Sequence, residues 1–100
     1  MALPAEVNLI SIAYQVDDIA QRIPLEHDRK VLGYLSSISA SEFFEAGRSG
    51  LKPQFRVSMF APDYQGETTV EVNGARYGVY RTYMASDDTI ELYLERKAGV

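Results

Sequence analysis

The 100-residue sequence has no cysteine, no tryptophan and a single histidine. Without cysteine, the chain can form neither a disulfide framework nor a thiolate metal site. It also lacks any apolar run near the roughly 20 residues that span a bilayer, and residues 1–4 show no feature of a secretory signal. We therefore expect no membrane segment, and stability has to come from one modest hydrophobic core.

An excess of basic residues is absent as well. Ten Lys and Arg stand against 14 Asp and Glu, which gives a net charge of −4. Proteins that hold nucleic acid tightly cluster basic residues, whereas here no basic run is longer than two. With 46% hydrophobic and 24% charged residues, the composition is that of an ordinary globular domain. We expect one domain over residues 1–100, with a surface that nucleic acid can pass without sticking.

Alternating apolar and polar residues predict six short strands. In the first strand, we take the face of Ile10, Ile12 and Tyr14 as the apolar one. Asn73-Gly74 is typical of a type I′ hairpin turn. In the last strand, the apolar residues at 90, 92 and 94 are predicted to face inward. The predicted strands are residues 7–16, 29–37, 54–60, 67–72, 75–83 and 89–95.

The clearest local signal is Ser-Ala-Ser-Glu at residues 39–42, which matches a capping box. Ser39 caps the amide of Glu42, and Glu42 is expected to reach back to the amide of Ser39. A short α-helix at about 40–47 follows, ended by a glycine at 47 or 50. Phe43, Phe44 and Ala46 cannot all be exposed, so we expect this helix to pack on the sheet. The fold class is therefore mostly β, a small antiparallel barrel or sandwich of about six strands with one short α-helix.

Residues 17–28, between the first two strands, are polar and contain Pro24. We interpret them as a long projecting loop, or as an extension that becomes ordered only against a neighbour. The candidate functional residues of this loop are Asp17, Asp18, Gln21, Arg22, Glu26, His27 and Asp28.

Catalytic and metal-binding arrangements fail on residue type or spacing. His27 lies between Glu26 and Asp28, but adjacent side chains on an extended chain point in opposite directions. No serine stands in a nucleophile-elbow context that would use His27. Residues 47–50, Gly-Arg-Ser-Gly, follow a helix and lack the full phosphate-loop pattern. We expect no enzymatic activity, no cofactor and no metal.

Seven tyrosines and four phenylalanines stand out in a chain this small. Tyrosine is favoured at interfaces because its ring buries area while its hydroxyl stays hydrated. A purely internal role is one alternative, and base stacking beside Arg76, Arg81 and Arg96 is another. The candidate subunit-interface residues are Tyr77, Tyr80, Tyr83 and Tyr93.

A family resemblance begins at the predicted helix. The residues that carry it are Glu42-Phe43-Phe44, Ala46-Gly47, Leu51-Lys52-Pro53, Phe55-Arg56-Val57, Asp63-Tyr64, Val70 to Gly74, Tyr77, Val79-Tyr80-Arg81 and Ile90-Glu91-Leu92. With the order of strands, polar segment and helix, they span about residues 7–97. In this order the chain resembles the head-tail joining proteins of tailed bacteriophages, also called head closure or stopper proteins.

The resemblance implies a small β-barrel subunit of a ring beneath the portal and adaptor of a filled phage head. Such a ring retains packaged DNA, which passes through its channel without specific binding, and offers a docking surface to the tail. The segment that would act as the plug is residues 17–28. The implied partners are further copies of the chain, the portal or adaptor protein and a tail completion protein.

The implied location is the head-tail interface of the virion, after synthesis in the bacterial cytoplasm. The alternatives are a joining subunit on the tail side and, from a different class, a small nucleic-acid-binding barrel that uses Arg76, Arg81 and the tyrosines.

Overall fold

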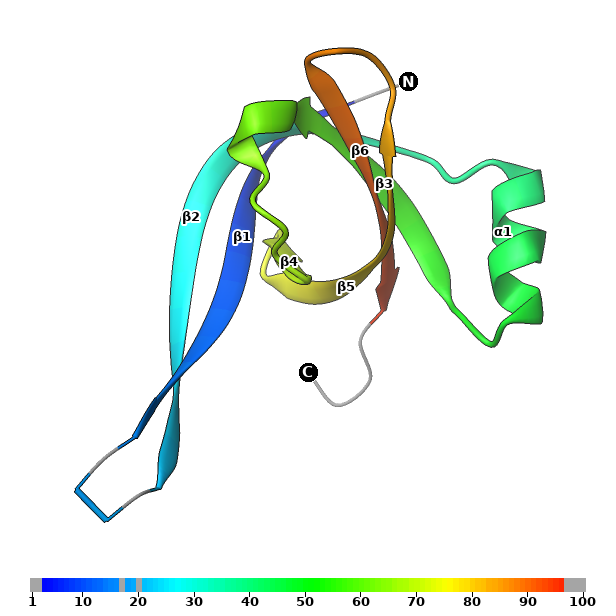
Figure 1. Cartoon of the computed structure of the whole chain (residues 1–100). Helices are drawn as coiled ribbons and strands as arrows, with labels where there is room; N and C mark the ends of the chain where they lie inside the picture. The colour runs from blue at the N-terminus through cyan, green and yellow to red at the C-terminus, as the bar shows by residue number, and fades with distance from the viewer. Residues whose placement is uncertain (1–2, 17, 20, 97–100) are drawn as a thin grey trace.

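The computed structural model describes residues 3–16, 18–19 and 21–96 and is mostly β (Figure 1). Its elements are β1 (Leu3–Val16), β2 (Arg22–Ser36), α1 (Ala40–Arg48), β3 (Pro53–Phe60), the 3₁₀ turn η1 (Ala61–Asp63), β4 (Thr69–Val72), β5 (Ala75–Met84) and β6 (Thr89–Arg96). Neighbouring strands are antiparallel and close into a barrel in the order β1-β2-β3-β6-β5-β4. The predicted fold class is confirmed.

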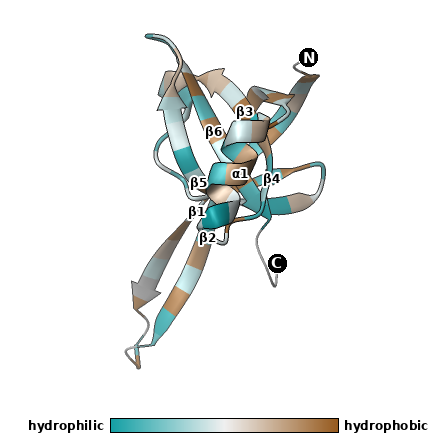
Figure 2. Cartoon of the chain, turned by 90° about the vertical axis from the view of Figure 1, so that its right-hand side faces the viewer, coloured by the Kyte–Doolittle hydropathy of each residue, from teal (hydrophilic) through white to brown (hydrophobic). Residues whose placement is uncertain are grey.

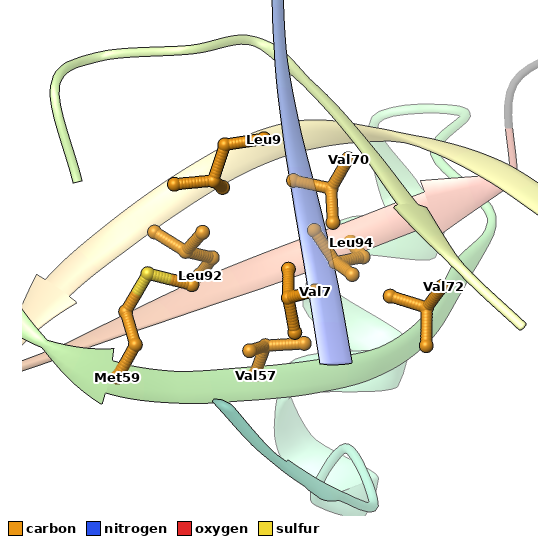
Figure 3. Close-up of a cluster of buried hydrophobic side chains, with 8 residues drawn as sticks. All are labelled: Val7, Leu9, Val57, Met59, Val70, Val72, Leu92 and Leu94. Carbon is orange, nitrogen blue, oxygen red and sulfur yellow. The ribbon is translucent and has the colours of Figure 1, made fainter. Parts of the chain in front are cut away.

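Aliphatic side chains from four strands fill the barrel, and Figure 3 shows them pointing toward one another. Partly buried residues of β2 and β5 pack around them. Fully burying one such side chain contributes about 1.5–3 kcal/mol, so this cluster is the main source of stability. Its members are Val7, Leu9, Val57, Met59, Val70, Val72, Leu92 and Leu94.

At Gly33 the backbone of β2 comes close to the core. A Cβ atom at this position would lie 2.8 Å from Cγ1 of Val57 and 2.8 Å from Cγ2 of Val7. Val31 and Leu35, on the same face of β2, pack against the core. Glycine is therefore required here for steric reasons.

The predicted inner face of the first strand is wrong. Val7 and Leu9 are fully buried in the core, whereas Ile12 and Tyr14 are about half exposed. The prediction relied on Ile12 and Tyr14, which lie in the distal half of the strand. This half extends beyond the barrel, and its side chains are exposed on both faces. Ile10 alone of the predicted face is buried.

The helix begins as predicted. Ser39 Oγ accepts a hydrogen bond from the amide of Glu42 at 3.2 Å. Of the three residues predicted not to be exposed together, Ala46 is buried. Phe43 and Phe44 are 50% and 67% exposed and contact each other edge to face. Over the described part of the chain, no helix has the length and apolar character needed to cross a membrane.

Candidate functional site

The segment predicted as a loop forms the outer half of a long β-hairpin. β1 pairs with β2 without interruption from Leu3↔Leu35 to Val16↔Arg22. The neighbouring strand β4 pairs with β1 only as far as Ile10, and β3 pairs with β2 only from Tyr34. Beyond these points the hairpin projects from the barrel as a two-stranded arm (Figure 1). We call residues 11–28 the arm, of which 17 and 20 lie outside the described residues.

The loop prediction is therefore wrong for residues 22–28, which are strand. Pro24, the residue that favoured a loop, lies opposite Tyr14. In the arm, β2 has β1 as its only described neighbour, and an edge strand tolerates a proline because one side of its backbone needs no ladder.

The base of the arm is held to the barrel by polar contacts. Both terminal nitrogens of Arg76, on β5, donate to the carboxylate of Glu26 at 2.9 Å. This hydrogen bonding lowers the pKa of Glu26. Nearby, Asn8 Nδ2 donates to Asp28 Oδ2 at 3.0 Å. Two of the acidic residues that suggested a solvated loop thus have partners that fix the direction of the arm.

Along the arm, apolar side chains are exposed to solvent. The radius of gyration, 14.9 Å, exceeds the roughly 13 Å expected for a compact chain of this length, and hydrophobic residues alternate with hydrophilic ones along the arm (Figure 2). An isolated hairpin is at best marginally stable in water, and exposed apolar patches mark interaction sites. The large apolar residues of the arm that are at least 40% exposed are Ile12, Tyr14, Val16, Ile19, Ile23 and Leu25.

The remaining predicted loop residues take separate positions. Asp18 and Gln21 are exposed near the hairpin turn, and Arg22 lies over the ring of Tyr14 at 4.5 Å. His27 pairs opposite Ser11, and Asp17 lies outside the described residues. Nowhere in residues 3–16, 18–19 and 21–96 do three or more His, Asp or Glu side chains gather closely enough to hold a metal ion.

A second apolar surface lies where β2 and β3 separate. Their ladder ends at Tyr34↔Ser58, although the same register would place Leu32 opposite Phe60. A groove of about 310 Å³ opens there, and Leu32 and Phe60 are 60% and 55% exposed. We call it the β2–β3 groove; it is lined by Leu32, Tyr34, Ser58, Met59, Phe60, Asp63, Asp88 and Thr89.

A partly buried ion pair joins β2 to the segment that follows η1. Arg29 Nη2 lies 2.6 Å from Oε2 of Glu67, and it also donates to the carbonyl of Asp63 at 2.7 Å. Glu67 is 6% exposed and accepts a further hydrogen bond from the amide of Gln65. No local pattern in the sequence indicates this pair, because its members are 38 residues apart.

The four tyrosines predicted to form a subunit interface divide into internal and exposed residues. Tyr93 is 7% exposed, so its assignment to an interface is corrected: it is part of the subunit interior. Tyr77 is half-buried, with its ring centroid 4.8 Å from that of Phe55. Tyr83 is 54% exposed, and a register shift between Val79 and Arg81 places it on the opposite face of β5 from Tyr77 and Val79.

Tyr80 connects the barrel to the helix. Its hydroxyl donates to Glu42 Oε2 at 3.0 Å, and Arg81 also binds the Glu42 carboxylate. Burial, together with the hydrogen bond to Glu42, raises the pKa of Tyr80. Glu42 thus holds α1 against β5 rather than bonding back to Ser39 as predicted.

Two of the three arginines named for a nucleic-acid interface are engaged by carboxylates. Arg76 pairs with Glu26 and Glu71, and Arg81 pairs with Glu42 and lies over the ring of Tyr93. Phosphate binding would require these contacts to break. Neither a protein-family model nor a curated protein sequence matches the chain.

Proposed function

We propose that the chain is a structural virion protein without catalytic activity, a subunit of the ring that closes a phage head where it meets the tail. One observation carries the proposal. A small closed barrel extends one hairpin far beyond its wall, and among its described residues that hairpin exposes six large apolar side chains. The sequence resemblance to head-tail joining proteins, with a projecting segment at this position, points to the same role.

Ring assembly is supported by two dissimilar apolar surfaces. The arm and the β2–β3 groove lie on different parts of the molecule and differ in shape. Head-to-tail contacts between unlike surfaces are those that close rings. A ring of this kind would give the portal or adaptor and the tail completion protein a shared platform.

A position around DNA is supported by the charge distribution. The net charge is −4, and Arg76 and Arg81 are neutralised by carboxylates of the same subunit. Such a surface lets DNA pass without holding it. Seated between subunits of the ring, the arm would then narrow the channel and retain the packaged DNA as a paired hairpin, which is stiffer than a free loop.

Removal of the arm tests this function. Ser11 and His27 are already cross-strand partners, so an Asn-Gly turn can join them in place of residues 12–26 and keep the barrel. We expect heads that package DNA and then lose it, measured as nuclease-sensitive DNA and empty heads in micrographs. An unchanged thermal unfolding of the barrel is the control.

Heads that stay sealed with the shortened chain would contradict the plug role. Binding of the full-length protein to isolated heads and to isolated tails distinguishes a head closure subunit from one on the tail side. A gel shift at low salt tests the nucleic-acid alternative, and we expect no shift.

A further inference from the structure

One face of the arm is both apolar and basic. Cross-strand register places Ile12, Tyr14, Val16 and Arg22 on the same face, together with Pro24 and with Glu26, whose carboxylate is paired with Arg76 of the same chain. The guanidinium of Arg22 lies 4.5 Å from the ring centroid of Tyr14, and no ion pair of Arg22 occurs among the residues that the structure describes. This face offers three apolar side chains beside one positive charge.

The β2–β3 groove is apolar with an acidic rim. Leu32 and Phe60 are more than half exposed, while Asp63 and Asp88 stand at the edge. Hydrogen bonds from the hydroxyls of Ser86 and Thr89 lower the pKa of Asp88, which keeps it charged. Within the described chain, neither rim aspartate forms an ion pair with a Lys or Arg side chain.

The two surfaces cannot meet within one subunit. In Figure 1 the tip of the arm and the Phe60 end of β3 lie at opposite ends of the molecule, whose longest dimension is 50 Å. Arg76 and Glu26 hold the base of the arm in this direction. An apolar, basic arm and an apolar, acidic groove on the same chain therefore fit each other only between copies.

We propose that the arm of one subunit binds in the β2–β3 groove of the next, with Tyr14 and Val16 against Leu32 and Phe60 and with Arg22 at the acidic rim. The contact is heterologous, so each subunit uses its arm toward one neighbour and its groove toward the other. The placement of this contact in a head closure ring rests on the proposed function. The contact itself needs only copies of this chain.

Cross-linking tests the contact directly, because the chain has no native cysteine. A Val16→Cys chain is mixed with a Leu32→Cys chain at about 1 mM, where even a weak complex is populated, and is then mildly oxidised. We expect the Val16–Leu32 heterodimer to be the main cross-linked species. The matched control replaces Leu32→Cys by Phe44→Cys, which is equally exposed but lies on α1.

Heterodimer yields no higher than those of the Phe44 control would overturn the proposal. A predominance of Val16–Val16 homodimers would overturn it too, because that product requires arm-to-arm contact.

Exchanging the charges is a second, independent test. Arg22→Asp and Asp63→Arg should each weaken self-association about tenfold, since each places like charges together. The chain that carries both exchanges should recover most of the loss, measured by sedimentation equilibrium. Additive losses in the double variant would reject the pairing of Arg22 with the acidic rim.

The outcomes separate this contact from the proposed function. If the chain forms rings on phage heads that lack the Val16–Leu32 cross-link, head closure stands and the arm-to-groove contact is rejected. If the cross-link forms but the protein does not bind heads, the contact stands and the head closure role is rejected.

Discussion

The strands β1 and β2 run through both the barrel and the arm, yet they bury apolar side chains in the barrel core and expose them in the arm. Within the barrel, β1 buries Val7 and Leu9 completely. A few residues farther along the same strand, Ile12 and Tyr14 are about half exposed. The difference lies in the neighbours, because β3 and β4 flank the hairpin only at the barrel. Closure of the sheet, rather than local pattern, decides which apolar residues form the core.

The largest expected effect sets a core residue against an arm residue. Leu92→Ala removes a fully buried side chain and should lower the free energy of unfolding by about 3–4 kcal/mol. Ile12→Ala, in the arm, should cost less than about 0.5 kcal/mol. Urea unfolding of both variants checks this. Equal losses of unfolding free energy in the two variants would show that Ile12 is packed in the isolated chain.

The next effect concerns the ion pair that joins the barrel to the segment after η1. Glu67→Gln removes the buried negative charge that pairs with Arg29 and should cost about 2–3 kcal/mol. Burial alone would raise the pKa of Glu67, but hydrogen bonds from Arg29 and the amide of Gln65 outweigh it, so this pKa lies below its ordinary value of 4.5.

This lowered pKa fixes the pH dependence. The stabilisation is fully present above pH 4.5, the ordinary value, and is lost as the pH falls through the lowered pKa. The Glu67→Gln variant should show a flatter loss of stability in acid than the native chain, measured by thermal unfolding. Asp18→Asn, at the exposed hairpin turn, is the control and should keep the native slope. Identical slopes for Glu67→Gln and the native chain would disprove the assignment.

A smaller effect follows from the close approach at Gly33. Gly33→Ala forces a methyl group against Val7 and Val57 and should cost about 1–3 kcal/mol. The matched control is Gly47→Ala, because a Cβ at that helical position meets no atom within 4 Å. That substitution should stabilise the chain by up to about 1 kcal/mol. A neutral Gly33→Ala would mean that the wall of the barrel relaxes at this point.

The smallest effect on stability should come from the contact that directs the arm. Arg76→Gln removes the hydrogen bonds to Glu26 on an exposed surface, so global unfolding should change little. Amide hydrogen exchange should quicken at the base of the arm and stay unchanged in β6. Arg48→Gln, which breaks an exposed pair with Glu45, is the control. Unchanged exchange in Arg76→Gln would show that the strands alone set the direction.

Local sequence signals predicted much of the barrel. Asn73 and Gly74 both have positive φ, at 53° and 80°, as the predicted turn requires. Leu92 and Leu94 face the core, as alternation in the last strand predicted. These features depend on residues close in sequence, so the alternation of apolar residues and the residue types of a turn are enough to predict them.

The arm could not be predicted in the same way. Its acidic residues pair with distant groups, such as Glu26 with Arg76 at a separation of 50 residues. Pro24 argues against a central strand but not against an edge strand, and the sequence does not reveal which strands become edges. The groove arises where two strands stop pairing, at Tyr34↔Ser58. Long-range pairing thus decides the site, while local chemistry decides most of the barrel.

The unbroken run of β1 and β2 from barrel to arm limits how this hairpin can change in length. Inserting one residue in a strand turns every later side chain to the other face. Either Arg22 would leave the face of Tyr14 and Val16, or Gly33 would leave the face that packs on the core. Viable length variants should therefore add two residues to each strand at once. The length of the arm would then increase in discrete steps of about 6.6 Å.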